Sequence, residues 1–194
     1  MNCEKVGNLI LTLRKEKHMT QKQLADLMNI SDKTISKWER GLGCPDVSLL
    51  RCLSEILGVN IEKILLGDLE PNHMDGGNMK KLKFYVCPTC GSTMTATGEA
   101  EISCCGRKLE PLTPQPADEA HRLNLETIEN DLYVTCSHEM TKDHSLSFIA
   151  CVTYDRVLFV KLYPEQDVQV RLPRMGRGTL YVCCSKHGLY VNGS

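Results

Sequence analysis

The sequence predicts a multidomain protein, all-α in its first third and all-β in the rest, with a small cysteine-rich module where the β-rich part begins. Apolar residues recur at three- and four-residue steps through residues 1–69, which indicates amphipathic helices. From residue 84 onward this period is lost, and short runs of β-branched and aromatic residues alternate with turn residues. Four of the eleven cysteines stand between residues 87 and 105, at spacings typical of a metal module.

Each element follows from its local pattern. Helices are expected at 9–17, 20–29, 31–41, 47–58 and 60–67. Strands are expected at 132–136, 145–154, 156–163, 168–172, 179–184 and 188–191. Residues 70–82 carry Pro71, Gly76 and Gly77 without an apolar period, which indicates a linker. The predicted domains are an all-α domain at 1–69, the linker at 70–82, a four-cysteine metal module at 83–113 and an all-β domain at 114–194.

Composition bounds the class of protein. A hydrophobic content of 42% over 194 residues is enough for folded cores, and no apolar run approaches the length of a membrane span. Because the first residues lack the apolar core and cleavage site of a signal peptide, we expect a cytoplasmic protein without a membrane partner. In the reducing cytosol, an odd number of cysteines favours metal ligation over a disulfide framework. The cysteines outside the metal motifs are expected to be small buried hydrophobes: Cys3, Cys44, Cys52, Cys136, Cys151 and Cys183.

Two consecutive helices in the all-α domain predict a helix-turn-helix. Thr20 and Gln23 form a capping box that opens the first of them, and Ser31 caps the second after a short turn. A helical wheel of the second helix places Ile35 and Trp38 on the core side. The opposite side is free to touch a partner and carries Lys33, Ser36, Lys37 and Arg40, with Thr34 at its flank.

The stretch TQKQLADLMNISDKTISKWERGLGCPDVSLLRCLSEILGV closely resembles the Cro/C1-type (XRE family) DNA-binding domain. The resemblance implies that the second helix enters the major groove of duplex DNA. By this resemblance Gln21, Lys33, Thr34 and Lys37 would face bases, and Ser36 and Arg40 would lie near phosphates. The alternative is a solvated charged face on a protein-interaction module. Residues 1–70 hold ten basic and ten acidic side chains, so electrostatic affinity should be modest and a homodimer is expected to be needed on DNA.

The cysteine-rich module offers four thiolates to one metal ion. Cys87 and Cys90 form a C-x2-C knuckle, and Cys104 with Cys105 follows after the segment 91–103. Adjacent residues on a straight strand point to opposite faces, so the second pair can share a metal only if the backbone twists, which Gly106 permits. The spacing alone admits zinc as well as rubredoxin-like iron, and a mixture of buried and idle thiols is the bland alternative. C-x2-C-G followed by C-C-G resembles the desulforedoxin-like module that begins desulfoferrodoxins, which implies one iron.

His138 and His144 stand six positions apart on either side of a short charged run. Neither a helix nor a strand lets two such rings meet, but a loop that folds back can bring them to one metal ion. Two solvated loop histidines are the alternative. Near the end of the chain, Cys184 and His187 show a further ligand spacing on a tight turn, and His121 precedes the strands of the β part.

Taken together, these residues resemble the superoxide reductase domain of desulfoferrodoxin and neelaredoxin over about residues 80–194. The resemblance implies an immunoglobulin-like β-sandwich with four imidazoles around a non-haem ferrous iron, an axial Cys184 thiolate and an open sixth position. It implies reduction of superoxide to hydrogen peroxide with one electron and two protons, from an electron donor such as rubredoxin. The residues it implicates in catalysis are Glu119, His121, His138, His144, Cys184 and His187.

The chain departs from this family at two places. The family loop usually reads Glu-Lys-His, whereas here Glu119 is followed by Ala120 and His121. In the family, the aromatic run after the second histidine of the H-x5-H pair usually contains a tryptophan. Here the run after His144 contains Phe148 instead, which should change the packing around the iron. Lys142 and Lys186 lie near ligands in sequence and could replace the missing cation. Two functions remain: an oxidative-stress regulator with a superoxide reductase domain, which we expect, or a redox-sensing transcriptional regulator without significant turnover.

Overall fold

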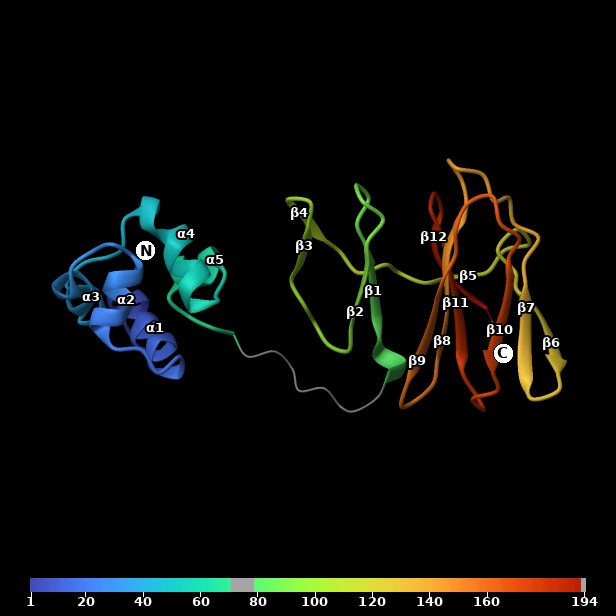
Figure 1. Cartoon of the computed structure of the whole chain (residues 1–194), viewed down its shortest axis with the longest axis horizontal. Helices are drawn as coiled ribbons and strands as arrows, with labels where there is room; N and C mark the ends of the chain where they lie inside the picture. Colours follow the sequence, from blue (N-terminus) through green and yellow to red (C-terminus); the bar gives the residue numbers. More distant parts are fainter. Residues whose placement is uncertain (71–78, 193–194) are drawn as a thin grey trace. The chain divides into compact units, whose positions relative to one another are not determined.

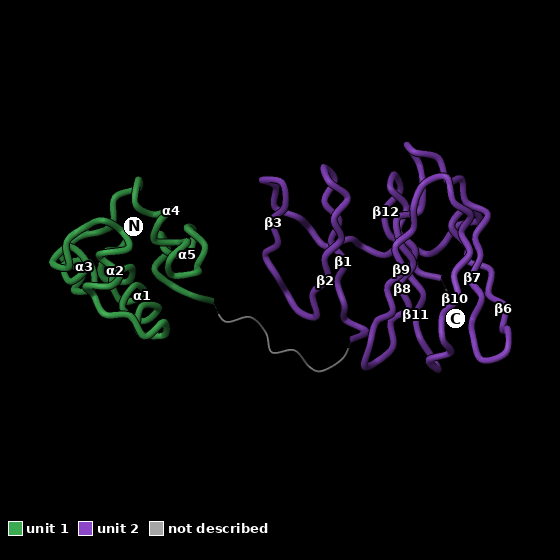
Figure 2. The backbone as a smooth tube through the Cα atoms, in the orientation of Figure 1, with its two compact units in different colours: residues 1–71 green, residues 72–194 purple. Residues whose placement is uncertain are grey.

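The computed structural model describes residues 1–70 and 79–192. The chain divides into two compact units, Met1–Pro71 and Asn72–Ser194, which are described separately (Figure 2). Most of the predicted linker lies outside the described residues, and its end, Met79–Lys81, forms a short 3-10 helix, η1. No helix in the described part of the chain combines the length and apolarity that a bilayer crossing needs.

The first unit is all-α, as predicted. Its helices are α1 (Cys3–Glu16), α2 (Gln21–Leu27), α3 (Asp32–Glu39), α4 (Val47–Leu57) and α5 (Ile61–Leu66) (Figure 1). The Thr20–Gln23 capping box is present at the start of α2, and the Ser31 side chain accepts the backbone N–H of Thr34 at the start of α3. The helices enclose one core, whose fully buried members include Ile10, Leu24, Ile35, Leu53 and Ile64.

Helices α1 and α3 meet closely and share a buried ion pair. A Cβ built on Gly7 would lie 2.0 Å from the Trp38 carbonyl oxygen, so only glycine allows this approach. Further along, Arg14 Nε donates to Glu39 Oε1 at 2.5 Å and Nη2 donates to Oε2 at 2.9 Å. Gln21 Nε2 also donates to Glu39 Oε2, at 2.7 Å. Burial by itself would raise the pKa of Glu39, but these hydrogen bonds outweigh it and lower the pKa.

The expectation that Cys3 and Cys44 are unpaired hydrophobes is wrong, because they form a disulfide. The fold brings the first residue of α1 to the segment between α3 and α4, where the two Cα atoms lie 5.0 Å apart. The other cysteines outside the metal motifs are free. Cys151 and Cys183 are buried, as expected, whereas Cys52 and Cys136 are half-buried at the edges of cores.

The second unit is all-β. Two hairpins come first, β1 (Lys83–Val86) with β2 (Thr93–Ala96) and β3 (Ile102–Cys104) with β4 (Arg107–Leu109). A three-stranded sheet has the order β10-β7-β6, and a five-stranded sheet has the order β5-β12-β11-β8-β9. These strands are β5 (Gln115–Pro116), β6 (Asn124–Ile128), β7 (Asp131–Thr135), β8 (Leu146–Val152), β9 (Val157–Lys161), β10 (Gln169–Pro173), β11 (Thr179–Cys184) and β12 (Gly188–Asn192).

The two larger sheets form a β-sandwich around a core to which both contribute. Val134 from β7 and Leu146, Ile149 and Val182 from β8 and β11 are fully buried in it. Burial alternates along β10, where Val170 and Leu172 face inward and their neighbours face solvent, as the period of two requires.

Strand β1 connects the cysteine module to the sandwich. Phe84 faces the sandwich and stacks on Phe148 with ring centroids 5.4 Å apart, while Tyr85 faces the small core of the module. The expectation that Phe148 alters the packing around an iron is therefore not supported by its contacts. Phe148 lies against Phe84 and Phe159, in a different cluster from Cys184.

Candidate metal centres and DNA-reading face

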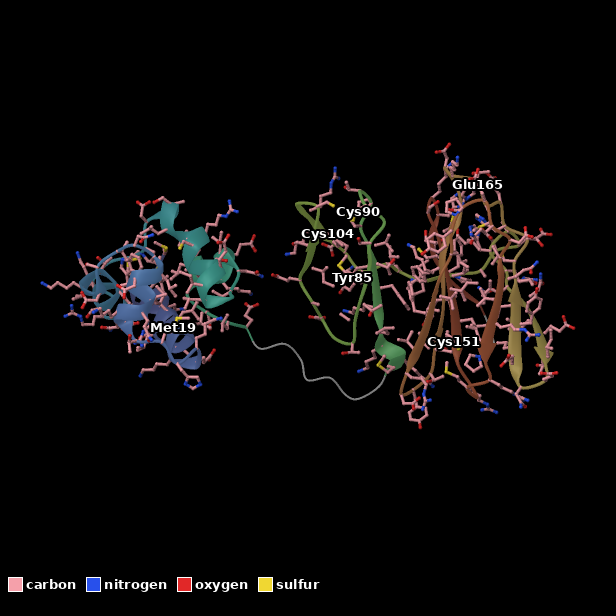
Figure 3. The ribbon with its side chains drawn as sticks, viewed as in Figure 1. Met19, Tyr85, Cys90, Cys104, Cys151 and Glu165 are labelled. Atoms are coloured by element: carbon pink, nitrogen blue, oxygen red, sulfur yellow. A yellow bond between two sulfur atoms is a disulfide. The ribbon has the colours of Figure 1, made fainter. Side chains whose placement is uncertain are left out.

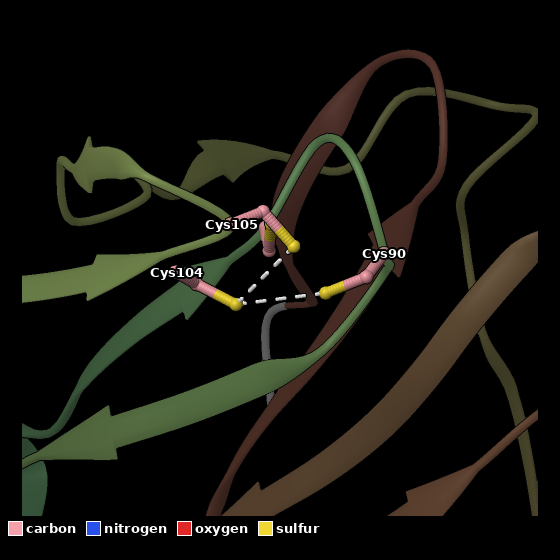
Figure 4. A group of neighbouring side chains, drawn as sticks. Cys90, Cys104 and Cys105 are labelled. Atoms are coloured by element: carbon pink, nitrogen blue, oxygen red, sulfur yellow. Dashed lines mark hydrogen bonds between the residues drawn. The ribbon is translucent and has the colours of Figure 1, made fainter.

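The four cysteines of the module come together at the tips of its two hairpins. The thiols of Cys87, Cys90, Cys104 and Cys105 all lie within 4.8 Å of one another. Cys90 Sγ is 3.6 Å from Cys104 Sγ, which in turn is 3.9 Å from Cys105 Sγ (Figure 4). Sulfurs at the corners of a tetrahedron with metal–sulfur bonds of about 2.3 Å are about 3.8 Å apart. The cluster therefore fits one tetrahedral metal ion.

The backbone twist expected at the adjacent cysteines is present. Cys104 ends β3 and pairs with Arg107, so Cys105 and Gly106 form a two-residue hairpin turn. Both have positive φ, 50° for Cys105 and 74° for Gly106, as a type I′ turn requires. In this left-handed conformation Cys105 turns its thiol back toward Cys104 rather than to the other face.

The first pair is held by a knuckle with a buried base. Gly91, with φ 68°, donates its N–H to the Cys87 carbonyl, and Cys87 donates its own N–H to the Ser92 carbonyl. Cys87 is buried with Tyr85 and Leu109, whereas Cys90 and Cys105 face solvent. Tyr85 and Cys90 are labelled in Figure 3. Contacts with Ser92 lower the pKa of Cys90 to about 6, and the neighbouring thiols of Cys90 and Cys87 raise the pKa of Cys104 to about 12. A divalent cation would relieve this competition for charge.

A second cluster lies at one end of the sandwich. Ligand atoms of His121, His138, Cys184 and His187 lie within 4.8 Å of one another. His144 is outside that group but beside it, because its Nε2 lies 3.2 Å from Cys184 Sγ. Its ring centroid is 4.6 Å from that of His138 and 4.8 Å from that of His187. The structure thus brings all five sequence-predicted ligands to one place.

The loop between His138 and His144 folds back on itself, as the spacing requires. Thr141 donates its N–H to the His144 carbonyl at 2.9 Å, and Thr141 Oγ1 accepts the N–H of His144 at 3.1 Å. The Thr141 hydroxyl also donates to Glu139 Oε1 at 3.1 Å. One threonine closes the loop and turns both imidazoles toward Cys184.

A bulge and a tight hairpin position Cys184 and His187. The pairing of β11 with β8 shifts between Cys183 and Cys184. As neighbours on a strand the two face opposite sides, Cys184 the sandwich core and Cys183 the other side. Cys184 pairs with Gly188 across the turn, and Gly188 has φ 89°. His187 Nδ1 consequently lies 3.6 Å from Cys184 Sγ and 3.4 Å from His121 Nε2.

One donor atom of this cluster has no protein partner. His138 Nε2 is buried and has no hydrogen-bond partner among the described residues, although its Nδ1 contacts the Glu139 carbonyl. Burial, with a contribution from the other imidazoles, lowers the pKa of His138 and keeps the ring neutral, which is the form that binds metal. An orphaned buried nitrogen beside a thiol and three more imidazoles fits an iron ion.

The exposed face of α3 carries the side chains expected to meet DNA. Lys33, Lys37 and Arg40 are exposed, while Ile35 and Trp38 on the opposite side are buried. Thr34 and Ser36 are half-buried at its edges, and Thr34 Oγ1 bonds to the Ser31 cap. Gln21 differs, because its amide is occupied by the buried Glu39.

Comparison with known proteins assigns these parts. Residues 10–64 match the protein family described as "Helix-turn-helix". The transcriptional activator BcrR of Enterococcus faecalis is 36% identical over 77 residues, which are 38% of this chain and 38% of that activator. A desulfoferrodoxin of Clostridium acetobutylicum is 26% identical over 117 residues, covering 56% of this chain and 94% of that protein. The chain joins a helix-turn-helix domain to a desulfoferrodoxin-like domain.

The fold of the desulfoferrodoxin-like domain agrees with this assignment. A superoxide reductase structure from Treponema pallidum superposes with a TM-score of 0.51 at 16% identity, covering 58% of this chain and 98% of that one. The two metal-binding clusters of this domain fit the iron sites of desulfoferrodoxin-like proteins.

Two carboxylates of the desulfoferrodoxin-like domain that the sequence analysis missed support its imidazoles. Asp118 Oδ1 lies 2.6 Å from His121 Nδ1, and Glu139 Oε2 lies 3.5 Å from His144 Nδ1. Glu119, which was predicted to be catalytic, lies on the exposed turn, and no hydrogen bond or ion pair of the described residues joins it to the cluster. The D-x-x-H spacing of Asp118 and His121 could have indicated this contact, because the Asp118 side chain accepts the backbone N–H of the residue three positions later.

Two lysines were candidates to replace the cation that is absent at Ala120, and the structure places them differently. Lys142 forms an ion pair with Glu165 at 3.7 Å, on the exposed rim. Lys186 is exposed between Cys184 and His187, and its charge acts on Glu139. Lys186 is thus the better candidate for a positive charge beside the site, because Lys142 is paired with Glu165.

Proposed function

We propose that this chain is a DNA-binding, oxidative-stress-linked regulator with a non-haem iron superoxide reductase centre. The reaction would take one superoxide, one electron and two protons to hydrogen peroxide. The observation that supports it is the gathering of four imidazoles around one thiol. Ligand atoms of His121, His138, His187 and Cys184 lie within 4.8 Å of one another. His144 Nε2 lies beside them, 3.2 Å from Cys184 Sγ. This donor set is the one expected from the family resemblance.

A ferrous ion held by these donors would supply the electron to superoxide. The protein's own part is to keep the imidazoles neutral and oriented and to shield the cluster partly from water. Burial keeps His138 unprotonated, and Asp118 and Glu139 hold His121 and His144 from behind. His187 is exposed, so the anion and two protons can reach this side of the cluster from solvent.

The four-cysteine centre would be structural or would relay electrons, because four protein donors leave no open position for a substrate. Iron suits four thiolates, and zinc does as well. We propose that an external donor such as rubredoxin supplies the electron.

The helix-turn-helix unit would bind duplex DNA through α3 as a homodimer. A helix-turn-helix pair reads two half-sites about one helical turn apart, which compensates for a unit with equal numbers of acidic and basic groups. A protein that reads chromosomal DNA works in the cytoplasm, where the free thiols of both clusters would stay reduced.

The alternative is an iron-based redox-sensing regulator without significant turnover. Ala120 favours it, because this position lacks the cation that would attract superoxide. Anaerobic purification, metal analysis and visible spectra with and without superoxide separate the two. An enzyme returns to the ferrous spectrum with a reductant and consumes further superoxide, whereas a sensor changes spectrum once.

A further inference from the structure

We propose that Cys3 and Cys44 are a site of redox modification that sets the DNA affinity of the helix-turn-helix unit. Their oxidation to the disulfide would fix the segment that follows the DNA-reading helix α3, and their reduction would release it. The statement about DNA rests on the DNA binding proposed above, whereas the redox chemistry of the pair stands without it.

The pair is placed for reversible chemistry. Cys3 is the first residue of α1, where the positive end of the helix dipole favours a thiolate. Cys44 lies between α3 and α4, and both residues are only half-buried, so small oxidants and reductants reach them. Cys52, the remaining cysteine of this unit, packs against the core and is free.

The disulfide holds a segment with few other anchors. Gly41 donates its N–H to the Trp38 carbonyl and Leu42 donates to the Lys37 carbonyl, and the backbone hydrogen bonds resume only at Asp46. Within residues 41–46, the bond from Cys44 to Cys3 is a covalent link to α1, added to the packing of Gly41 against Glu4.

The same segment supports a residue of the DNA-reading face. A Cβ built on Gly43 would lie 3.4 Å from Lys37 Cε and 3.8 Å from its Cδ, so the backbone of the segment packs along the Lys37 stem. On the other side, a Cβ on Gly41 would lie 3.0 Å from the Glu4 Cα in α1. Fixing the segment therefore restricts Lys37, and releasing it lets the lysine and the end of α3 move.

The reducing cytosol makes this pair a switch rather than a permanent brace, since disulfides there are usually transient. One thiolate attacks hydrogen peroxide, breaking its O–O bond and forming a sulfenic acid and water. The second thiol then forms the S–S bond and releases the second water, so two thiols and one peroxide give one disulfide and two waters. The proposed activity of the desulfoferrodoxin-like domain supplies this oxidant.

The redox arm of the test uses the full chain and its single tryptophan, Trp38, which reports on the helix-turn-helix unit. We expect peroxide to protect Cys3 and Cys44, but not Cys52, from alkylation in peptide mass mapping. Reduction should lower the unfolding midpoint read by Trp38 fluorescence by about 10 °C or more. Cys3→Ser and Cys44→Ser should give the low midpoint in both states, and the control Cys52→Ser should respond as the wild type does. The proposal would be overturned if Cys3 and Cys44 were still alkylated after peroxide treatment, or if reduction left the unfolding midpoint unchanged.

The DNA arm uses one duplex selected from a random pool by the oxidised full chain. Reduction should weaken its binding by about fivefold or more in the wild type and in Cys52→Ser, and should change nothing in Cys3→Ser. Equal affinity in both states would overturn the regulatory part of the proposal. If no duplex is selected in either state, the proposed DNA binding fails, and the Trp38 and alkylation results still decide the redox site.

Discussion

The Asp118 carboxylate accepts two hydrogen bonds from one histidine, from His121 Nδ1 at 2.6 Å and from the His121 backbone N–H at 2.9 Å. The bond to the ring lowers the pKa of Asp118, so the carboxylate stays charged. With Nδ1 occupied, Nε2 is the nitrogen that faces the cluster. Tyr190 stacks on the other side of the ring, with centroids 3.9 Å apart, and Asn192 Nδ2 donates to the His121 carbonyl. His121 is therefore held ready before any metal arrives.

Asp118→Asn should weaken iron binding at the histidine cluster by about 10- to 100-fold, because the imidazole loses the charged partner that orients it. Competition with a chelator, read by metal analysis of the full chain, measures this. Glu119→Gln is the matched control, since that neighbouring carboxylate makes no contact with the cluster among the described residues, and it should bind iron as the wild type does. Equal losses in both variants would show that Asp118 does not position His121.

Cys90→Ser should empty the four-cysteine centre while leaving the histidine cluster loaded. Contacts with Ser92 favour the thiolate form of Cys90, so the variant would lose a thiolate ligand. The hydroxyl oxygen that replaces it is a poor ligand for iron or zinc. Metal analysis should fall by one equivalent per chain. Cys136→Ser, a free thiol outside the four-cysteine cluster, should keep the full metal content. A Cys90→Ser protein with the full content would contradict the assignment.

The buried Arg14–Glu39 pair should make the helix-turn-helix unit sensitive to acid. Because the pKa of Glu39 is lowered on folding, its contribution is complete above the ordinary value of 4.5 and is lost as pH falls through the lower folded value. The Trp38 unfolding midpoint should therefore fall with acidification below about pH 4.5. Glu39→Gln should cost about 3 kcal/mol at neutral pH and lose this part of the pH dependence. If Glu39→Gln keeps the wild-type acid profile, another group is responsible.

Ala120→Lys should accelerate the reaction of the ferrous protein with superoxide, most visibly at low salt. The new ammonium would add a positive charge on the exposed turn before His121, and salt would screen it. Ala120→Gln is the uncharged control of similar length and should leave the rate unchanged. Pulse radiolysis at two ionic strengths measures both rates, and an equal response of the two variants would argue against electrostatic attraction.

Most of the helices and strands could be predicted from local sequence patterns. The caps at Thr20 and Ser31 and the apolar period are local, so the helices were predictable. Short spacings between suitable residue types indicated the four-cysteine module and the pairs His138/His144 and Cys184/His187. The full set with His121 came from the resemblance to the superoxide reductase family. The contacts of Gln21 and Phe148 depend instead on segments far away in sequence, Glu39 in one case and Phe84 in the other.

The Cys3–Cys44 bond shows most clearly what sequence reasoning could not supply. The two cysteines are separated by 41 positions, and nothing local to either of them points to the other. Their meeting depends on the close approach of α1 and α3, which requires Gly7 beside the Trp38 carbonyl. The reducing compartment and the odd number of cysteines predicted free thiols, and neither property indicates which two cysteines the fold brings together.

We propose above that four imidazoles and the Cys184 thiolate form an iron centre that reduces superoxide. Pulse radiolysis of the anaerobically iron-loaded full chain, with Cys184→Ser and the matched control Cys183→Ser, tests it most directly, since Cys183 is the neighbouring thiol on the opposite face of β11. We expect the wild type and Cys183→Ser to consume superoxide far faster than spontaneous dismutation and to release one hydrogen peroxide per ferrous centre, and we expect Cys184→Ser to be sharply impaired. A fully loaded wild-type protein that leaves the decay of superoxide unchanged would contradict the claim.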